Sequence, residues 1–305
     1  MSFFEIQLEI VSKCKLGCIH CSSESIINSE FVDINYSFVH LEYLIDQLIQ
    51  RTDNVSIYLT GGEPLLFSNL QKTIKQINSF NAKLILGLFS SGIVLNANDE
   101  IKSLDYEAVK MLKLSGLTDV YLSIYSDKTT VHDYMVGSEN ALSVTLKTLS
   151  ELKKQDINIF FNTVINKTNV NNLHEIVEFA KREKASGIRF LKLIKHGRAV
   201  ANWDDIGLDY NEQESAIKDL LSKTKTNNYI TVAGFPHLTP CRPNKLANGC
   251  QAGKCFFYID LFGYLYPCGC TKNNIQHRIC HISQMDVMQS LFDKLDEKNG
   301  YCYCR

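Results

Sequence analysis

Three cysteines lie close together near the N-terminus of this 305-residue chain. Cys14, Cys18 and Cys21 fall within the stretch SKCKLGCIHCSS, residues 12–23, and the other eight cysteines all lie within residues 241–304. Cysteines that only fill a hydrophobic core would be scattered along the chain, whereas residues 22–240 contain none. The two dense clusters therefore indicate that thiolates bind metal in both regions.

The composition is that of an ordinary globular protein. Hydrophobic residues make up 45% and charged residues 21%, and the formal net charge is −1, so the chain can bury a sizeable core. The balanced charge favours neither nucleic acid nor an anionic membrane as a partner. The N-terminal sequence MSFFEIQLEI lacks the basic region of a secretory signal, and no apolar run is long enough to span a membrane. We therefore expect a cytoplasmic protein, in which disulfides are disfavoured.

Short apolar segments alternate with amphipathic segments of helical length through the first two-thirds of the chain. This alternation predicts an α/β fold with a parallel sheet and right-handed crossovers. The expected strands are residues 3–11, 55–61, 84–91, 119–126, 158–165 and 187–194. The expected helices lie near residues 36–51, 68–80, 100–115, 138–155 and 171–185. Six such repeats favour a partial (β/α)6 TIM-like barrel over a complete eightfold barrel.

Two loops follow the first two expected strands. The first contains the three cysteines, and the second reads TGGEPLLF, residues 60–67. Gly61 and Gly62 let the backbone approach a ligand closely, and Glu63 supplies a carboxylate. Because parallel β/α folds bind ligands at the carboxyl ends of their strands, we expect both loops at one face of the barrel.

With Cys-x3-Cys-x2-Cys after the first strand and Gly-Gly-Glu-Pro after the second, the chain resembles the radical S-adenosylmethionine (radical SAM) superfamily. The resemblance implies that Cys14, Cys18 and Cys21 bind a [4Fe–4S] cluster. Such a cluster normally takes four thiolates, so three leave one iron open. In the family, S-adenosylmethionine (SAM) fills that position, and an electron from the cluster cleaves it to a 5′-deoxyadenosyl radical that removes hydrogen from the substrate.

The same resemblance implies which other residues contact SAM. His20 stands at the position near the adenine, the Gly61–Pro64 segment at the part that holds the methionine amino group, and Ser123 at the position facing the ribose and methionine. Ser91, in FSSG, replaces the amide of a frequent Thr-Asn-Gly motif, and LIKHGRA, residues 193–199, is a further correspondence. The expected SAM-contacting residues are His20, Gly61, Gly62, Glu63, Pro64, Ser91, Ser123 and Asn162. The sequence identifies no catalytic side chain.

Other interpretations of these motifs exist. A zinc knuckle needs a fourth ligand, and His20 is poorly placed because it is adjacent to Cys21. A redox pair of Cys18 and Cys21 would explain neither Cys14 nor the Gly-Gly-Glu-Pro loop. For Ser91, Ser123 and Asn162 there is a second interpretation, in which each is an ordinary polar residue at the end of a strand and contacts no ligand.

The C-terminal region predicts a small second domain. We expect a barrel over residues 1–199, a polar connector over 200–235 and a cysteine-rich domain over 236–305. FFYID and YLYP flank a tight turn, which predicts a β-hairpin, and a helix is expected at residues 284–297. A hairpin, a helix and a terminal cysteine pair resemble the twitch domain, the shortened relative of the SPASM domain, which carries auxiliary [4Fe–4S] clusters.

The tail cysteines allow more than one ligand set. By the resemblance, Cys250 and Cys268 join the terminal pair Cys302 and Cys304, although that pair is spaced Cys-x-Cys where the family has Cys-x-x-Cys. One or two auxiliary clusters are compatible with the number of cysteines, and a structural zinc site is the alternative. The remaining candidate ligands are Cys241, Cys255, Cys270 and Cys280.

The resemblance implies an oxidoreductase, and the twitch-like tail favours an enzyme that matures a ribosomally synthesised peptide (RiPP) by a crosslink, a thioether or an epimerisation. The alternative is a small-molecule dehydrogenase that uses an auxiliary cluster as electron acceptor. A third interpretation is a non-catalytic iron–sulfur or zinc protein. Expected partners are a precursor peptide, a separate leader-recognition protein and an electron donor such as flavodoxin or ferredoxin.

Overall fold

The structure is a computed structural model of the chain. It describes residues 3–23, 33–52, 54–81, 83–224, 228–236, 238, 250–272 and 274–293. The candidate ligands Cys241, Cys302 and Cys304 therefore lie outside the described residues.

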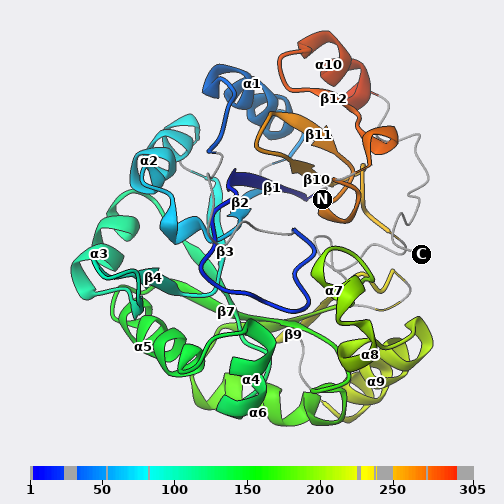
Figure 1. The fold of residues 1–305 in the computed structure, drawn as a ribbon. Helices are drawn as coiled ribbons and strands as arrows, with labels where there is room; N and C mark the ends of the chain where they lie inside the picture. The colour runs from blue at the N-terminus through cyan, green and yellow to red at the C-terminus, as the bar shows by residue number, and fades with distance from the viewer. Residues whose placement is uncertain are drawn as a thin grey trace.

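The fold is α/β, with a mostly parallel sheet covered by helices (Figure 1). Each of the six predicted strands is present, within three residues of its expected ends. They are β1 (Phe4–Val11), β2 (Val55–Gly61), β3 (Ile85–Ser90), β6 (Asp119–Ser123), β7 (Asn158–Val164) and β8 (Gly187–Leu191). All five adjacent pairs in the order β1-β2-β3-β6-β7-β8 are parallel, as predicted.

The predicted helices are also present, some of them shorter than expected. They are α1 (Phe38–Ile49), α2 (Leu70–Phe80), α3 (Tyr106–Leu114), α5 (Ala141–Lys153) and α6 (Leu173–Arg182). The sequence analysis missed α4 (Thr129–Val136) and the hairpin of β4 (Ile93–Leu95) and β5 (Ile101–Ser103), which takes up the start of the segment expected to be one helix over residues 100–115. Short 3-10 turns η1 (Pro64–Leu66) and η2 (Val170–Asn172) precede α2 and α6.

The segment expected to be a connector is ordered structure. It forms α7 (Arg198–Ala201), α8 (Trp203–Ile206), α9 (Tyr210–Lys223) and β9 (Ile230–Ala233). Helix α9 begins with a capping box, in which Asp209 and Glu212 satisfy each other's backbone N–H groups. Strand β9 pairs in parallel with β8, so this segment extends the sheet.

The tail is joined to the sheet through β1. The predicted hairpin forms as β10 (Phe256–Ile259) and β11 (Tyr264–Tyr266), followed by η3 (Gly269–Thr271), η4 (Ile275–His277), β12 (Cys280–His281) and α10 (Met285–Asp293). Strand β10 pairs in parallel with β1, and the ten-stranded order is β12-β11-β10-β1-β2-β3-β6-β7-β8-β9. The sixfold partial barrel and the domain boundaries stay predictions, because strand pairing continues from the barrel region into the tail.

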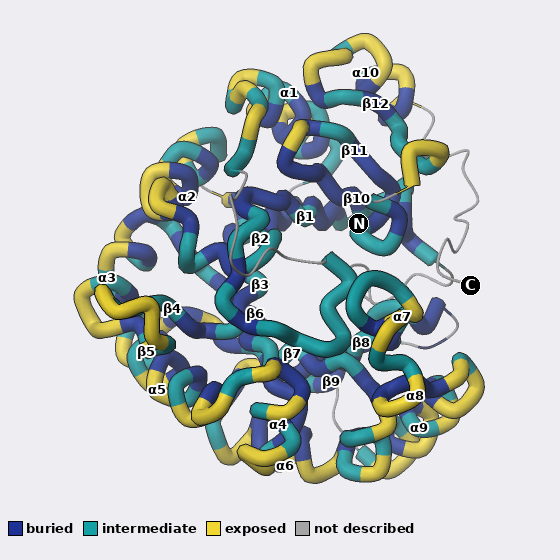
Figure 2. The backbone as a smooth tube through the Cα atoms, in the orientation of Figure 1, coloured by how far each residue is buried: buried dark blue, intermediate teal, exposed yellow. Residues whose placement is uncertain are grey.

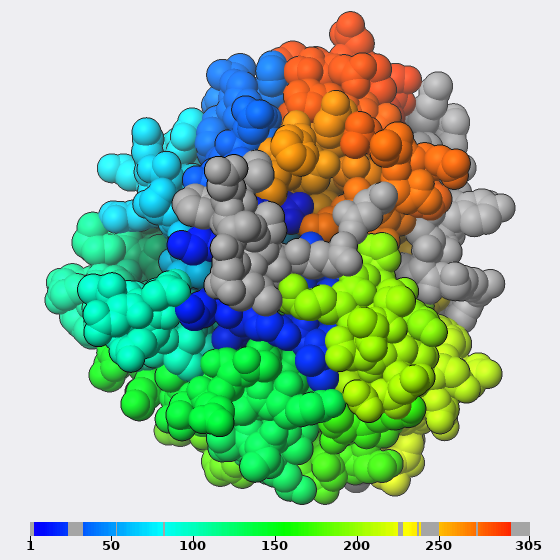
Figure 3. Space-filling view, in the orientation of Figure 1, coloured from blue at the N-terminus to red at the C-terminus, as the bar shows by residue number. Residues whose placement is uncertain are grey.

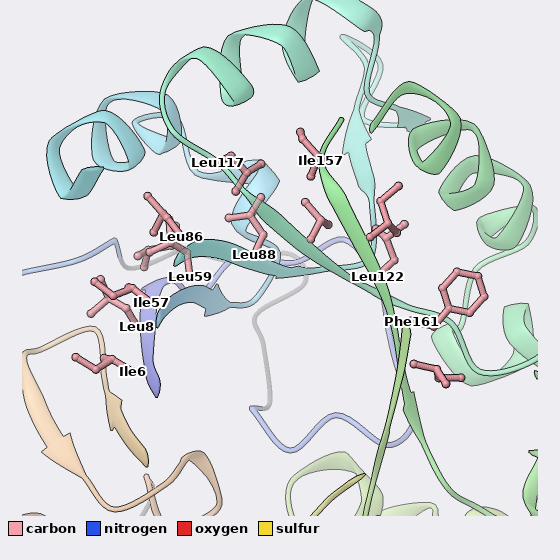
Figure 4. Close-up of a cluster of buried hydrophobic side chains, with 14 of the residues drawn as sticks. Ile6, Leu8, Ile57, Leu59, Leu86, Leu88, Leu117, Leu122, Ile157 and Phe161 are labelled. Atoms are coloured by element: carbon pink, nitrogen blue, oxygen red, sulfur yellow. The ribbon is translucent and has the colours of Figure 1, made fainter. Parts of the chain in front are cut away.

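The main hydrophobic core lies between the sheet and the outer helices. Apolar side chains alternate along each strand, so that one face of β1 carries Ile6, Leu8 and Ile10, all fully buried. Figure 4 shows Leu8 beside Ile57 and Leu59 from the neighbouring strand. In Figure 2 much of the central sheet is dark blue, whereas exposed yellow segments lie on the outer helices.

The opposite face of the sheet is polar and aromatic. Tyr121 stacks on Phe160 with ring centroids 4.7 Å apart, and it contacts Phe89 at 5.2 Å. The guanidinium of Arg189 lies 4.9 Å from the centre of the Phe89 ring. Arg189 Nη1 and Glu5 Oε1 are 3.5 Å apart, with side chains 5% and 0% exposed. This buried ion pair links β8 to β1 across the inside of the sheet.

We predict that Arg189→Met destabilises the protein by about 3–5 kcal/mol, because it leaves the Glu5 carboxylate buried without its cation. The midpoint of urea unfolding under anaerobic conditions measures the loss. The double variant Glu5→Gln/Arg189→Met removes both charges and should lose less. Lys181→Met, which breaks the exposed Lys181–Glu178 pair, is the control and should have little effect. Equal stability of Arg189→Met and wild type would contradict the prediction.

Candidate active site

A cavity of about 380 Å³ lies at the carboxyl ends of the strands. It is lined by Cys14, Cys18 and Cys21 and by seven of the eight predicted SAM-contacting residues: His20, Gly61, Gly62, Glu63, Ser91, Ser123 and Asn162. Figure 3 shows the N-terminal segment, in blue, near the middle of one face, between the green middle of the chain and the orange tail. The structure thus brings together residues that are far apart in sequence.

The cysteine loop is held by hydrogen bonds to two helices, α4 and α7, that were not predicted from the sequence. The amide of Ile19 donates to the carbonyl of Met135 in α4 (3.1 Å). From α7, Arg198 Nε donates to the carbonyl of Cys18 (2.9 Å), and the Arg198 amide donates to that of Cys21 (3.0 Å). The LIKHGRA segment therefore contributes by ordering the loop. Arg198, which lies within LIKHGRA, was the residue in the sequence that pointed to these contacts.

The thiols of this loop are poorly stabilised as free anions. Burial raises the pKa of Cys18 well above its ordinary value, the nearby Cys14 and Cys21 raise it further, and the charge of Arg198 partly opposes them. A group of three thiolates in such a place needs positive charge beside it, which iron supplies. In the described ranges, no three Cys, His, Asp or Glu side chains are close enough together to bind one metal ion. A [4Fe–4S] cluster does not need such a group, because each thiolate binds a different iron. The donor set fits such a cluster.

The second loop packs directly on the end of β1. The Gly62 amide donates to the Val11 carbonyl (2.7 Å), and the Glu63 amide donates to the Lys13 carbonyl (2.8 Å). A Cβ atom on Gly61 or Gly62 would lie 2.1 Å from a carbonyl oxygen of Val11 or Lys13. These glycines are thus required by the close approach of two backbone segments, and they fix the cysteine loop relative to β2.

The carboxylate of Glu63 connects this loop to the next strand. Its Oε1 accepts hydrogen bonds from Ser90 Oγ (2.6 Å) and the Leu65 amide (3.1 Å), and its Oε2 accepts from the Ser91 amide (2.7 Å) and Ser91 Oγ (2.6 Å). Burial raises the pKa of Glu63, and these hydrogen bonds act in the opposite sense. Pro64 begins η1 and does not line the cavity. Glu63 and Ser91 therefore bond to each other, and their expected contacts with SAM stay predictions.

Polar groups without protein partners lie around the same cavity. Asn162 Oδ1 and Arg189 Nε are buried and have no hydrogen-bond partner. Ser123, Asn162 and Arg189 are consecutive register partners across β6, β7 and β8. Because buried polar groups in native proteins are normally hydrogen-bonded, these atoms fit a polar ligand such as SAM.

His20 also contacts a tyrosine that the sequence analysis gave no role. His20 Nε2 lies 2.9 Å from the hydroxyl of Tyr125, and their ring centroids are 4.5 Å apart. Tyr125 and His132 belong to the stretch SIYSDKTTVHDYMVG, residues 123–137, directly after the strand that carries Ser123. Burial lowers the pKa of both His20 and His132 to about 4, which keeps both imidazoles neutral at pH 7.

The tail supplies one wall of the cavity. Cys250, Cys268 and Cys270 line it. Cys255 lies outside the lining, and its thiol donates to Gln251 Oε1 (3.1 Å). Cys280 is on β12, where burial raises its pKa to about 11. The structure brings three of the five described tail cysteines to the cavity and leaves Cys255 and Cys280 away from it.

The model of the radical SAM superfamily matches residues 8–180, which is more than half of the chain. The chain belongs to the radical SAM superfamily. Membership makes it an enzyme and implies a [4Fe–4S] cluster and SAM. Among the described helices, none has the length and apolar character needed to cross a membrane.

Curated relatives carry two different names. A GTP 3′,8-cyclase of Helicobacter pylori is 26% identical over 96% of this chain and 85% of its own length. An AdoMet-dependent heme synthase of Methanosarcina barkeri is 22% identical over 87% of this chain and 76% of its own length. The chain spans only 57% of the length of other GTP 3′,8-cyclases that it matches.

Two solved structures share the fold. Streptococcus suis SuiB bound to precursor peptide SuiA has a TM-score of 0.67 at 16% identity, covering 98% of this chain and 68% of SuiB. Native anSMEcpe with bound AdoMet has a TM-score of 0.67 at 16% identity, covering 96% of this chain and 82% of the other. At these identities the likeness shows the fold alone.

We predict that Glu63→Gln weakens SAM binding without removing the cluster. The amide of glutamine would face the Ser91 N–H as a second donor, and hydrogen bonds to charged groups contribute about 1.5–3 kcal/mol each. Isothermal titration with SAM should show at least about a tenfold loss of affinity at unchanged iron content. Glu175→Gln, on the exposed first turn of α6, is the control. Unchanged SAM affinity in Glu63→Gln would show that the carboxylate does not order the site.

Proposed function

We propose that this enzyme reductively cleaves SAM and abstracts a hydrogen atom from a ribosomally synthesised peptide. One observation carries the proposal: a single cavity is lined by the three-cysteine loop, the Gly-Gly-Glu loop, the polar ends of β6 and β7, and cysteines of the tail. Such a cavity can place a cluster, SAM and a substrate in contact with one another.

Each motif has a separate task in this proposal. Cys14, Cys18 and Cys21 hold the [4Fe–4S] cluster and leave one iron open for SAM. The Gly61–Glu63 backbone and Ser123 orient the methionine and ribose, and His20 and Asn162 offer hydrogen bonds to the rest of the molecule. When bound, the cluster and SAM supply a 5′-deoxyadenosyl radical; the protein positions the reactants and keeps water out.

The tail cysteines at the cavity support an auxiliary [4Fe–4S] cluster. Cys250 and Cys268 line the cavity, and Cys302 and Cys304 are proposed to complete a set of four thiolates with them. Cys241, Cys255, Cys270 and Cys280 remain as candidate ligands of a second auxiliary cluster. Either cluster would accept the electron left after hydrogen abstraction in an oxidation.

Two features support a peptide substrate. The twitch-like order of hairpin, helix and terminal cysteines resembles peptide-modifying members of the superfamily, and the fold matches a structure bound to a precursor peptide. We propose a precursor peptide as partner, whose leader docks on the barrel or the tail or arrives with a separate leader-recognition protein. Flavodoxin or ferredoxin is the proposed electron donor. The cytoplasmic location proposed for the enzyme would keep its clusters in a reducing environment.

A small-molecule oxidoreductase is the second candidate. Two observations favour it: the curated relatives that match most of this chain are named GTP 3′,8-cyclase and AdoMet-dependent heme synthase, and the cavity volume falls within the range typical of small-molecule sites. Turnover of a purified peptide encoded beside this gene would support the first candidate, and turnover of a small molecule without peptide would support the second.

We predict about eight irons per chain after anaerobic reconstitution if there is one auxiliary cluster, or about twelve if there are two. A Cys14→Ala, Cys18→Ala, Cys21→Ala variant should lose about four irons and all reductive SAM cleavage. The matched variant Cys250→Ala, Cys268→Ala, Cys270→Ala should lose tail iron and still cleave SAM. Zinc in the tail with only about four irons would contradict the auxiliary cluster, and absence of both iron and cleavage would contradict the enzyme proposal.

The modification itself can be identified by mass spectrometry in D₂O. An epimerisation should consume SAM stoichiometrically and place one deuterium at a peptide α-carbon, because a hydrogen donor must return an atom to the radical. A crosslink or thioether should remove two hydrogens, because it is a net oxidation. A peptide that loses two hydrogens would exclude epimerisation.

A further inference from the structure

The guanidinium of Arg189 lies on the cavity floor, by which we mean four side chains that line the cavity: Glu5, Gln7, Phe89 and Arg189. Arg189 is on β8 and its ion-pair partner Glu5 is on β1, and four strands separate β8 from β1 in the sheet. Between them, the guanidinium lies 4.9 Å from the ring centre of Phe89 on β3 and 5.3 Å from that of Tyr121 on β6. The side chain therefore crosses the inside of the sheet and rests on two aromatic rings.

This guanidinium has more donors than the described residues use. An arginine side chain carries five N–H donors and no acceptor. Among the described residues, its polar contact is between Nη1 and Glu5 Oε1, at 3.5 Å a long hydrogen bond, and Nε is buried without a hydrogen-bond partner. Glu5 occupies one end of the group, and the two rings occupy one side of it. The remaining N–H groups thus face the cavity, where a ligand can supply the acceptors that buried donors normally have.

The positive charge of Arg189 is already neutralised. Glu5 is fully buried, and its Oε1 also accepts a hydrogen bond from Gln7 Nε2 (3.2 Å). The carboxylate is therefore held in place between Gln7 and Arg189. An anionic ligand group bound to Arg189 would lie beside this fixed carboxylate, and like charges repel strongly where water is excluded. A neutral acceptor avoids that repulsion and still accepts a strong hydrogen bond from a charged donor.

The other charged side chains in the described lining do not turn the floor into an anion site. Lys272 forms a buried ion pair with Glu9 (2.8 Å), and the Lys192 ammonium lies 5.2 Å from the ring centre of Tyr210 in α9. Glu63 adds a further carboxylate to the lining. The floor thus combines strong donors with little net charge, which suits an amide carbonyl better than a phosphate or a carboxylate.

We propose that Arg189 is a specificity-determining residue, whose neutralised guanidinium donates hydrogen bonds to an uncharged carbonyl oxygen of the substrate, such as that of a peptide group. Glu5 sets this preference, because it makes an anion unfavourable at the same place. The inference deepens the proposed function and rests on it, since it assumes that the substrate occupies the cavity. It assigns Arg189 to the substrate and leaves Asn162, its register partner on β7, with its proposed role toward SAM.

The charge of the floor is tested with inorganic pyrophosphate, titrated calorimetrically into the iron-reconstituted enzyme with SAM present. Glu5→Gln keeps the shape of the side chain and removes its charge, so it should bind pyrophosphate at least about tenfold more tightly than wild type does. The double variant Glu5→Gln/Arg189→Met should lose this gain. Glu175→Gln, on the exposed first turn of α6, is the matched control and should show no gain.

The carbonyl contact is tested with a peptide that the enzyme turns over. Arg189→Lys keeps the positive charge but lacks the Nε donor, so it should raise KM for the peptide about tenfold. The kcat, the iron content and SAM cleavage without peptide should change little. A role in stability alone would lower the midpoint of unfolding without moving KM. Arg182→Lys, at the exposed end of α6, is the matched control and should leave KM unchanged.

Two results would overturn the inference. One is equal affinity for pyrophosphate in wild type and Glu5→Gln, and the other is an unchanged KM for the peptide in Arg189→Lys. If Glu5→Gln does not fold, the Arg189→Lys comparison decides alone. Absence of peptide turnover in wild type would instead overturn the proposed function and the inference with it, so the wild-type assay distinguishes the two failures.

Discussion

The site depends on the close contact between the ends of β1 and β2. The Gly62 and Glu63 amides donate to the carbonyls of Val11 and Lys13, and the two segments lie so close that a Cβ atom on Gly61 or Gly62 would have no room. This contact fixes the start of the cysteine loop against the second loop through backbone atoms. Because backbone atoms have little freedom once strands are paired, the relative position of the two motifs is determined by the sheet itself.

Side-chain contacts connect this pair of loops to the other strands of the sheet. Glu63 bonds to Ser90 and Ser91 and so connects the second loop to the end of β3. On the other side of the cavity, Tyr125 connects the end of β6 to the cysteine loop. Below the cavity, the Glu5–Arg189 pair joins β1 to β8. These polar links are buried or partly buried, and a hydrogen bond shielded from water is strong when both partners are present and costly when one partner is removed.

The sequence was sufficient for features that depend on local patterning or on spacing. Short apolar runs alternating with segments of helical length predicted the six strands, and the place of the two loops after parallel strands predicted that they meet at one face. Strand β9 was missed because ITVA is a short apolar run after a polar segment, and only its pairing with β8 makes it part of the sheet. The pairing of β10 with β1 was missed for the same reason, since it joins residues about 250 positions apart and such contacts leave no periodic signal in the sequence. The contact between Tyr125 and His20 depends on which way the Tyr125 side chain points after β6 ends. Sequence patterns do not specify that direction.

The position of β10 has a consequence for how the two halves of the site can work together. Strand β1 pairs with β2 on one side and with β10 on the other, and neighbouring strands lie about 4.8 Å apart. The cysteine loop leaves the carboxyl end of β1, and Cys268 and Cys270, which follow the antiparallel strand β11, line the same cavity. The buried Lys272–Glu9 ion pair (2.8 Å) adds a direct link between the tail and β1. The tail is thus tied to the strand that carries the cysteine loop, so the distance between the thiols of Cys14, Cys18 and Cys21 and the tail cysteines is constrained by strand pairing. A substrate bound between the loop cysteines and the tail cysteines would lie at a fixed distance from each group. This arrangement suits a reaction in which the substrate gives up a hydrogen atom on one side and an electron on the other.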